Sequence, residues 1–209
     1  LVEHFRRYAE ESVLPLVSNI AELVVDIGGN DGTLLRFIRD YCNTLNVDPE
    51  AARLTGLTPS VALPFSSEVA KRMRDQFGRA KVVTANNVLA HVDDVHDFLK
   101  GVHHLLSDDG TFIFEVHWVK DLIDRTGYDQ IYHEHLCYFS LTALWKMLRH
   151  AGLAAYDVNV VQNHGQSLRV FAKKITDNLA SFPAVTSRAS EVFSLESNAG
   201  INGIWAYQA

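Results

Sequence analysis

Several things are scarce in this chain of 209 residues, and each shortage excludes a class of protein. Its two cysteines, Cys42 and Cys137, cannot build a four-thiolate metal site, and they do not suggest a disulfide scaffold. Lys and Arg number 19 against 25 Asp and Glu, and this net charge of −6 argues against non-specific contact with nucleic acid. We therefore expect a cytoplasmic protein that does not bind nucleic acid.

Long apolar runs are also lacking. No segment approaches the roughly 20 uncharged apolar residues of a membrane helix, and the opening LVEHFRRYAEE is too charged for a secretory signal. We expect no membrane contact. What the chain does have is apolar content: 47% of its residues are hydrophobic and 21% are charged, which is enough for one domain with a full core.

Apolar segments of strand length alternate with amphipathic segments, which indicates strands alternating with helices. Four or more alternations predict an α/β fold with a Rossmann-like, mostly parallel sheet covered on both faces, closed by an antiparallel hairpin. The expected strands are 23–27, 44–48, 60–63, 81–85, 111–116, 154–161 and 168–174, with 108–110 as a turn before the fifth. The expected helices are 33–38, 66–77, 95–106 and 141–150, with a further helix beginning near Pro49.

The chain divides into three parts by composition. Residues 1–19 form an expected helical segment that is broken near Pro15. Residues 20–176 form the α/β domain. Residues 177–209 are polar and rich in small residues, so we interpret them as a linker or as the start of a truncated C-terminal domain.

The sharpest local feature is a glycine-rich turn between the first strand and its helix: Asp26, Ile27, Gly28, Gly29, Asn30, Asp31 and Gly32. Glycines let a backbone approach a ligand closely, and a helix N-terminus offers free N–H groups. Asp48 ends the second expected strand, where a carboxylate can accept two hydrogen bonds from a ribose diol. A ligand with an adenosine end satisfies both features, whereas the alternative is a turn that is merely tight.

Two cofactors have such an end, a dinucleotide and S-adenosyl-L-methionine. Gly28, Gly29 and Gly32 depart from the G-x-G-x-x-G spacing of dinucleotide sites. Asp26 would repel a pyrophosphate, whereas it can accept a hydrogen bond from the ammonium group of a methionine. The residues therefore favour S-adenosyl-L-methionine.

Three polar residues lie at or shortly after the end of the fourth expected strand. Asn86 and Asn87 stand at its end. Because ligands of open α/β sheets bind at the carboxyl ends of the strands, we expect both beside the cofactor. Ordinary capping of the loop is the alternative. His91 comes shortly after them and is expected at the mouth of the same site.

Four sequence strings resemble the sugar C-methyltransferase family, whose members act on nucleotide-linked deoxy-keto-sugars. The resemblance extends from Val24 to Lys174, and its most specific parts are the YHEH and HG-x-SLR motifs. The strings are VVDIGGNDGTLLRFI, VVTANNVLAHVDDVHDFLKGVHHLLSDDGTFIFEV, YDQIYHEHLCYFSL and HGQSLRVF. The resemblance implies a seven-stranded class I methyltransferase fold.

The resemblance also implies where the chemistry occurs. It places S-adenosyl-L-methionine contacts at Gly28, Asn30, Asp48 and the segment 86–91, and it makes the segment 132–135 the reactive centre with its second histidine as general base. The family usually has a cysteine-rich zinc module and a further C-terminal domain, which two cysteines and 209 residues cannot supply. Gln166 replaces a glycine that is usual in HG-x-SLR, which affects the expected backbone of that loop.

Methylation of carbon needs a base that generates an enolate and a donor for the enolate oxygen, and histidine suits the base because its pKa lies near neutrality. We assign His135 as base, Glu134 as its orienting or polarising partner and Tyr132 as proton donor or hydrogen-bond donor to the enolate, with no metal. His133 is the alternative base, and it would share a face with His135 if the segment were extended. A metal site at 133–135 and ordinary polar loop residues are the other interpretations.

The expected substrate is a small molecule, a nucleotide-linked keto-sugar, with weaker substrate contacts at His133, His164 and Arg169. For Arg169, an exposed strand charge is the commoner explanation. An O- or N-methyltransferase that acts on a small molecule is the first alternative function. An inactive cofactor-binding fragment is the second, and the oligomeric state stays open.

Overall fold

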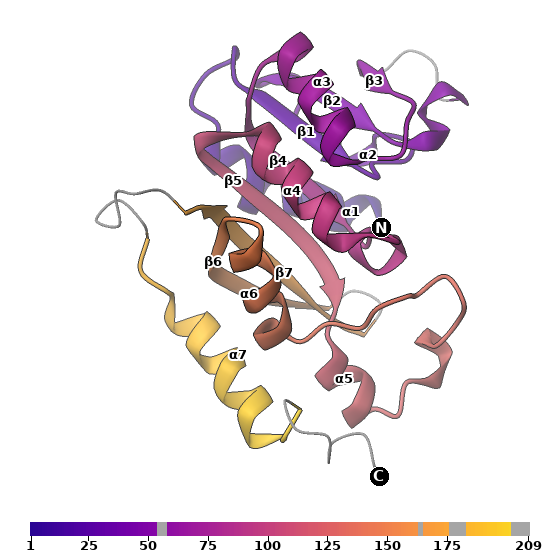
Figure 1. Ribbon diagram of the computed structural model, residues 1–209, viewed down its shortest axis with the longest axis vertical. Coiled ribbons are helices and arrows are strands. Elements are labelled where there is room, and N and C mark those ends of the chain that lie inside the picture. The colour runs from indigo at the N-terminus through magenta and orange to yellow at the C-terminus, as the bar shows by residue number, and fades with distance from the viewer. Residues whose placement is uncertain (54–57, 163–164, 176–182, 202–209) are drawn as a thin grey trace. The chain divides into compact units, whose positions relative to one another are not determined.

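The computed structural model describes residues 1–53, 58–162, 165–175 and 183–201 (Figure 1). His164 and the expected domain boundary at 176–177 lie outside these residues. The chain forms two compact units, the first made of residues 1–86 and 94–113 and the second of residues 87–93 and 114 onward. No helix among the described residues is both long and apolar enough to cross a membrane.

Unit 1 has alternating strands and helices. Its elements are α1 (Val2–Tyr8), the π-helical turn η1 (Ala9–Val13), the 3₁₀ turn η2 (Leu14–Leu16), β1 (Leu23–Ile27), α2 (Thr33–Arg36), β2 (Asn43–Val47), the 3₁₀ turn η3 (Pro49–Arg53), β3 (Ser60–Val61), α3 (Ser67–Phe77), β4 (Ala80–Asn86), α4 (Val95–Leu105) and the first part of β5 (Leu106–His117). Strands β3, β2, β1 and β4 pair in parallel in that order.

Unit 2 begins with the 3₁₀ turn η4 (Leu89–His91) and continues from the end of β5. Its other elements are α5 (Val119–Asp124), the 3₁₀ turn η5 (Tyr128–Gln130), α6 (Leu141–His150), β6 (Leu153–Gln162), β7 (Gln166–Lys174) and α7 (Ser187–Asn198). β6 and β7 are antiparallel, as expected for the closing hairpin. The seven strands follow the order β3-β2-β1-β4-β5-β7-β6, which confirms the predicted fold class.

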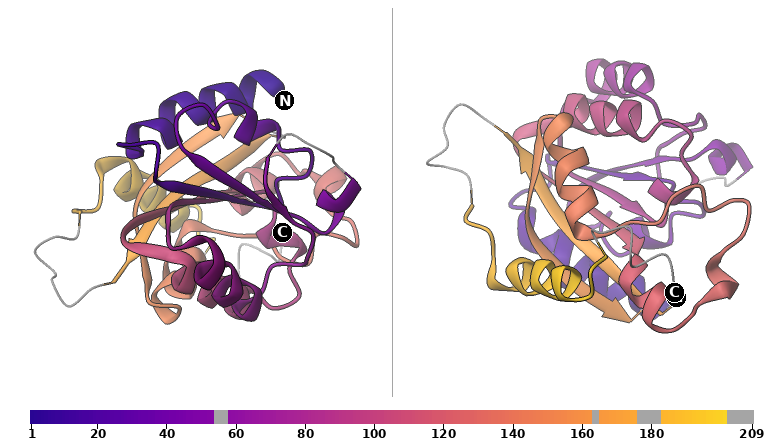
Figure 2. Two further views of the ribbon diagram at one scale, coloured as in Figure 1. Left: turned by 90° about the horizontal axis from the view of Figure 1, so that it is seen from above. Right: turned by 60° about the horizontal axis from the view of Figure 1, so that its bottom comes forward.

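In unit 1 the strand order reverses between β1 and β4. Right-handed crossovers on the two sides of such a point place their helices on opposite faces of the sheet. Accordingly, α1 packs with α2, and α3 packs with α4, on opposite sides of the strands (Figure 2). Because both faces are covered, every residue of β1 is buried.

Most helices start at a side chain that accepts a hydrogen bond from the backbone of the first turn. Ser66, Asp94, Ser140 and Thr186 do this for α3, α4, α6 and α7. α4 buries the apolar face that the sequence predicts, including Phe98, Leu99 and Val102. Local sequence signals therefore fix where these helices begin and which face they bury.

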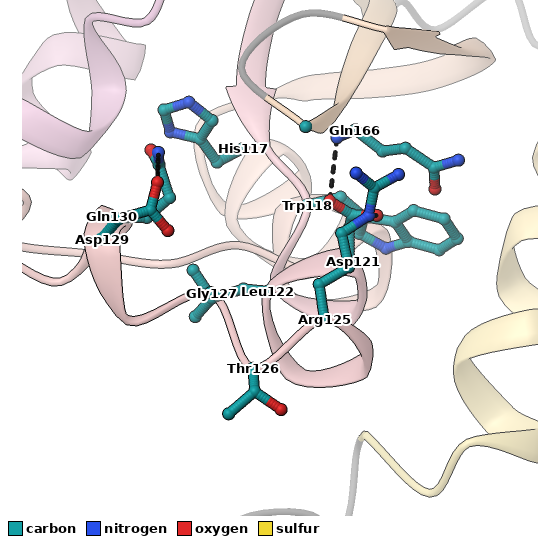
Figure 3. Close-up of a pocket in the computed structure, with 11 residues that line it drawn as sticks. His117, Trp118, Asp121, Leu122, Arg125, Thr126, Gly127, Asp129, Gln130 and Gln166 are labelled. Atoms are coloured by element: carbon teal, nitrogen blue, oxygen red, sulfur yellow. Dashed lines mark hydrogen bonds and ion pairs between the residues drawn. The ribbon is translucent and has the colours of Figure 1, made fainter.

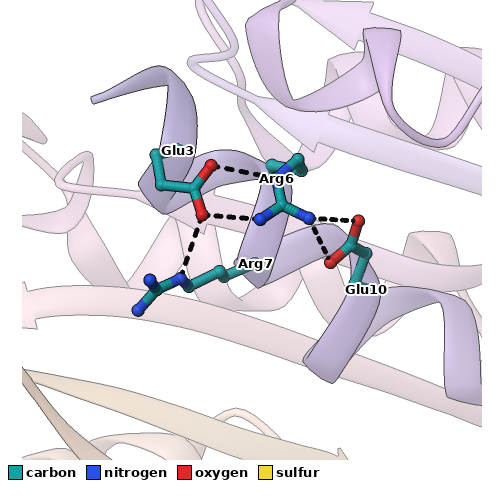
Figure 4. Close-up of polar contacts among 4 residues, drawn as sticks. All are labelled: Glu3, Arg6, Arg7 and Glu10. Atoms are coloured by element: carbon teal, nitrogen blue, oxygen red, sulfur yellow. Dashed lines mark hydrogen bonds and ion pairs between the residues drawn. The ribbon is translucent and has the colours of Figure 1, made fainter.

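An exposed ion-pair network connects α1 with the π-helical turn η1 (Figure 4). Arg6 bonds to Glu3 at 2.6 Å and to Glu10 at 2.8 Å, and Arg7 bonds to Glu3 at 3.1 Å. The hydrogen bond from Arg6 lowers the pKa of the Glu3 carboxyl to about 2. Solvent-exposed ion pairs add little to stability, so this network contributes little to the stability of the fold.

Three expectations differ from the structure. β5 begins at Leu106, so residues 108–110 lie inside a strand rather than in a turn. Helix α5 and turn η5 occupy a stretch for which the sequence indicated no element. Residues 187–198 form helix α7 rather than a linker, because Ala189, Val192 and Glu196 recur at helical spacing and are all buried.

Candidate active site

The glycine-rich turn lies at the carboxyl ends of β1 and β2. The N–H of Gly28 donates to the Val47 carbonyl at 2.7 Å, and the N–H of Asn30 donates to Asp48 Oδ2 at 3.0 Å. Asp48 Oδ1 accepts from the N–H of Glu50 at 2.8 Å. These bonds fix the carboxylate, yet each of its oxygens keeps a further lone pair for a ligand hydroxyl.

Gly29 is required by the side chains around it. A Cβ at this position would lie 2.4 Å from Asn46 Oδ1 and 2.6 Å from Asp26 Oδ2. Asn46 Nδ2 in turn donates to the Asn30 carbonyl at 2.9 Å. The turn is therefore held by two polar side chains from the strands, and the missing side chain of Gly29 makes room for them.

Asp26 lies deep within this arrangement and is only 3% exposed. Thr84 Oγ1 donates to its Oδ1 at 2.7 Å. Burial raises the pKa of the Asp26 carboxyl to about 7. These contacts show a residue that supports the turn, and its predicted direct contact with the ammonium group of the cofactor stays a prediction.

The end of the turn starts helix α2. Asp31 Oδ1 accepts hydrogen bonds from the N–H and the hydroxyl of Thr33 at 3.0 and 2.5 Å. The N–H of Gly32 closes the turn by donating to the Gly29 carbonyl at 2.8 Å. Asp31 and Gly32 thus shape the backbone of the expected cofactor site.

Two consecutive asparagines follow the buried part of β4. Asn86 ends β4 in unit 1, and Asn87 opens unit 2 with a left-handed backbone at φ 56°. Among the described residues, the Oδ1 atoms of both are buried and accept no hydrogen bond, and the same holds for Asn46 Oδ1. A buried acceptor of this kind fits a donor on a ligand.

Among the described residues of unit 1, the groups that could face a ligand are hydrogen-bond acceptors: the carboxylate of Asp48 and the unpartnered amide oxygens of Asn46 and Asn86. Ribose hydroxyls and an ammonium group both donate, whereas a pyrophosphate only accepts. The residues of this region therefore fit S-adenosyl-L-methionine better than a dinucleotide.

In unit 2, His135 is the centre of a cluster of rings. Its ring centroid lies 4.9 Å from that of His91 and 5.2 Å from that of His117, and Tyr132 and Tyr138 also contact it. Its side chain is nearly buried, with the residue 7% exposed. The predicted base is thus held inside a cluster, in contrast to an ordinary surface histidine.

Hydrogen bonds define which nitrogen of His135 is basic. Nδ1 lies 2.8 Å from the Gln130 carbonyl oxygen, and Nε2 lies 2.8 Å from the Tyr132 hydroxyl. Because a carbonyl can only accept, Nδ1 must bear the proton, and Nε2 of the neutral ring then accepts from Tyr132. Nε2 is therefore the nitrogen that can take up a proton.

His133 and Glu134 do not occupy the positions that their predicted roles require. Residues 132–134 form a turn rather than an extended segment, so His133 and His135 do not share a face. The His133 side chain is 90% exposed, and the Glu134 side chain is 65% exposed and lies 3.9 Å from His133. The carbonyl of Gln130, not Glu134, orients the ring of His135.

The metal interpretation of this segment is not supported either. His133 is exposed while His135 is buried, so their side chains do not converge. In the described part of the chain, no three His, Cys, Asp or Glu side chains are grouped as metal ligands.

Three separate segments meet at the His135 cluster. The N–H of Leu136 donates to the Ala90 carbonyl at 2.8 Å, which brings the segment of His135 to that of His91. The N–H of Asn87 donates to the Glu115 carbonyl at 2.9 Å. This bond holds the segment that leads into η4 beside the end of β5, where His117 lies. Backbone hydrogen bonds between distant segments thus bring the histidines together.

Arg169 is placed differently from both sequence interpretations. It is buried, and its Nε and Nη2 both lie 2.7 Å from Glu115 Oε1. The guanidinium is therefore neither an exposed strand charge nor a group turned toward an open surface. Its predicted contact with substrate has no support in this geometry.

A buried carboxylate from α7 also reaches this region. Glu196 accepts hydrogen bonds from the indole N–H of Trp118 at 2.8 Å, and from the N–H groups of Leu141 and Thr142 at 2.6 and 2.9 Å. The Thr142 hydroxyl adds a fourth at 2.7 Å. Glu196 thus connects α7 with the start of α6 and with the residue that follows His117.

Sequence reasoning missed Asn46, Thr84, His117, Gln130 and Tyr138. Asn46 and Thr84 had a usable signal, since each is a polar residue inside a strand expected to be buried on both faces. His117 similarly ends an apolar strand. Gln130 acts through its backbone carbonyl, which no side-chain pattern reveals.

The chain matches known proteins along most of its length. Residues 2–158 match the family described as "Methyltransferase domain". The chain is 32% identical over 197 residues to C-methyltransferase NovU of Streptomyces niveus. That match covers 91% of this chain and 47% of NovU, so the chain spans about half the length of that relative.

Solved structures show the same fold. An S-adenosylmethionine-dependent methyltransferase of Archaeoglobus fulgidus has a TM-score of 0.64 and 14% identity, covering 83% of this chain and 95% of that one. The 1,6-didemethyltoxoflavin-N1-methyltransferase of Burkholderia thailandensis, solved with S-adenosylhomocysteine, has a TM-score of 0.57 and 22% identity, covering 83% and 80%.

The fold and the acceptor-rich turn define a class I methyltransferase architecture. The chain belongs to the methyltransferase domain family. Family and fold agree with the methyltransferase class and the S-adenosyl-L-methionine cofactor expected from the sequence.

Proposed function

We propose that the chain transfers a methyl group from S-adenosyl-L-methionine to a carbon atom of a nucleotide-linked deoxy-keto-sugar. The observation on which this rests is the state of His135: a buried imidazole whose Nδ1–H is held by a carbonyl and whose Nε2 faces the Tyr132 hydroxyl. The 32% identity to a C-methyltransferase supports transfer to carbon.

Unit 1 would hold the cofactor. Asp48 accepts hydrogen bonds from the ribose hydroxyls, and the Asp26–Gly32 turn positions the adenosine and methionine parts through its backbone. The buried oxygens of Asn46 and Asn86 accept from donors of the bound molecule. The cofactor supplies a methyl group on a positively charged sulfur, which a carbon nucleophile can attack.

The residues around His135 would generate that nucleophile. Nε2 takes the proton from the carbon next to the ketone; the electron pair of the C–H bond forms a C=C bond, and the π pair of the carbonyl moves onto its oxygen to give an enolate. The Tyr132 hydroxyl, which bonds to Nε2 in the absence of substrate, then donates to that oxygen. A positioned base contributes a factor of roughly 10² to 10⁴ to the rate.

Solvent exchange tests this proposal. In deuterium oxide and without cofactor, the full-length protein should exchange the sugar hydrogen next to the ketone, because the base acts before the methyl group is transferred. The matched control is His135→Asn, in which exchange should fall to the uncatalysed rate. If no keto-sugar nucleotide shows exchange or accepts labelled methyl, transfer to a hydroxyl or amine replaces transfer to carbon.

A further inference from the structure

A polar cavity of about 450 Å³ lies within unit 2, between α5, the turn 126–130 and the start of β7 (Figure 3). This volume is within the range of roughly 300–1,000 Å³ that small-molecule sites occupy. The lining residues with charged, amide, hydroxyl or imidazole side chains are His117, Asp121, Arg125, Thr126, Asp129, Gln130 and Gln166.

One wall of the cavity is fixed by Asp121. Its carboxylate accepts from the N–H of Gln166 at 2.9 Å and pairs with Arg125 at 2.7 Å. A Cβ on Gly165 would come within 2.8 Å of Asp121 Oδ2, so only glycine lets the carboxylate sit against this turn. Gln166 itself has no left-handed backbone, so its side chain replaces the family's glycine without strain and lines the cavity.

The opposite wall is shared with the His135 cluster. Figure 3 shows His117, Asp129 and Gln130 on one side of the cavity and Asp121, Arg125 and Gln166 on the other. The Gln130 carbonyl accepts from His135 Nδ1, and the His117 ring contacts the His135 ring. His135 does not itself line the cavity, but a molecule in the cavity would lie against Gln130 and His117, two residues that contact its ring.

The charges of the lining select a kind of ligand. Asp121 neutralises Arg125, which leaves the carboxylate of Asp129 as the remaining charge among the Asp, Glu, Lys and Arg residues of the lining. A diphosphate would be repelled by this charge, whereas hydroxyl and amino groups donate hydrogen bonds to carboxylates and to amide oxygens.

We infer that this cavity binds the sugar ring of the substrate and excludes its phosphates. Asp129 accepts from a hydroxyl or amino substituent of the ring, and the amide of Gln166 provides a second hydrogen-bonding group from the fixed wall. This inference rests on the proposed function and adds a specificity site to it. The diphosphate then binds outside the cavity.

The test compares Asp129→Asn with Asp124→Asn in the full-length protein. Asp124 belongs to the neighbouring helix α5, pairs with Lys120 and does not line the cavity, so its replacement is a matched change of charge. Calorimetry measures binding of a keto-deoxyhexose linked to thymidine diphosphate and of thymidine diphosphate alone. Methyl transfer to the same sugar nucleotide gives KM and kcat.

We expect Asp129→Asn to raise both the Kd and the KM of the sugar nucleotide about tenfold or more, because a hydrogen bond to a charged group is lost. The affinity for thymidine diphosphate alone and for S-adenosyl-L-methionine should stay unchanged, and Asp124→Asn should change none of these values.

Two results would overturn the inference. If Asp129→Asn leaves the KM unchanged, or weakens thymidine diphosphate as much as the sugar nucleotide, the cavity does not bind the sugar while the proposed function stands. If the unaltered protein binds the cofactor but neither binds nor methylates keto-sugar nucleotides, the proposed function fails, and the inference fails with it.

Discussion

The turn after β1 and the cluster around His135 hold their functional groups by different kinds of contact. In the turn, the backbone connects β1, which pairs in parallel with β2, to the helix that follows, and the side chains of Asp26 and Asn46 pack against this backbone. In the cluster, side chains from three segments contact one another, and backbone hydrogen bonds only bring those segments together.

This difference suggests which kind of change each region tolerates. A backbone-built site depends on the absence of side chains at a few positions, so an added methyl group disrupts it. A side-chain cluster depends on the identity of each ring, so it is sensitive to the chemistry of one atom. Substitutions should therefore separate the two regions by what they impair.

The largest effect should come from His135→Asn. The variant should lose methyl transfer by a factor of roughly 10² or more, because the basic Nε2 is removed, while the affinity for S-adenosyl-L-methionine changes only a few-fold. Single-turnover transfer of labelled methyl and calorimetry measure the two quantities. His133→Asn is the control, because His133 is exposed and should leave turnover near its normal value. Normal turnover in His135→Asn would remove the base from its role.

Gly29→Ala should produce the opposite pattern in unit 1. The added Cβ would lie 2.4 Å from Asn46 Oδ1, so the turn must shift and the affinity for the cofactor should fall about tenfold or more. Gly78→Ala is the control for backbone strain alone: its φ of 90° disfavours alanine, but nothing lies within 4 Å of its Cβ position, so the folded variant should keep its cofactor affinity. Equal affinities in both variants would show that the turn does not hold the cofactor.

The smallest expected effect concerns pH and stability. Burial raises the pKa of Asp26 to about 7, so between about pH 4 and pH 7 the folded chain keeps a proton that the unfolded chain has lost. The free energy of unfolding therefore falls as the pH rises through this window. Asp26→Asn keeps an acceptor for Thr84 without the charge, and its gain in Tm over the natural chain should grow by several degrees from pH 5 to pH 8. A pH-independent difference in Tm would contradict this account.

The two regions were also predictable to different degrees. The turn, Asp48 and Asn86 follow from strand ends and glycine positions, which are local in sequence, and the strand order agrees with the fold class. The choice of His135 over His133 came from family resemblance, and it agrees with burial only because residues 132–134 form a turn that no periodicity indicated. The orienting partner of His135 was assigned wrongly, since a backbone carbonyl takes that place.

Two other wrong expectations, for Arg169 and for residues 187–198, concern polar side chains that prove to be buried. Arg169 looked like a surface charge because its partner Glu115 lies 54 residues earlier, on another strand. The tail was expected to be a linker or the start of a further domain because it is polar and rich in small residues, yet its Glu196 is buried against Trp118 and the start of α6. Arg169 and Glu196 can both be buried because each forms hydrogen bonds with residues far away in the sequence.

The carboxylate of Glu196 connects helix α7 with Trp118 and with the first turn of α6. If α7 were pulled away, the indole of Trp118 and the first amides of α6 would lose their acceptor in one step, and Trp118 directly follows His117. Loss of α7 would therefore affect the residue next to His117 as well as strand β6, against which α7 packs.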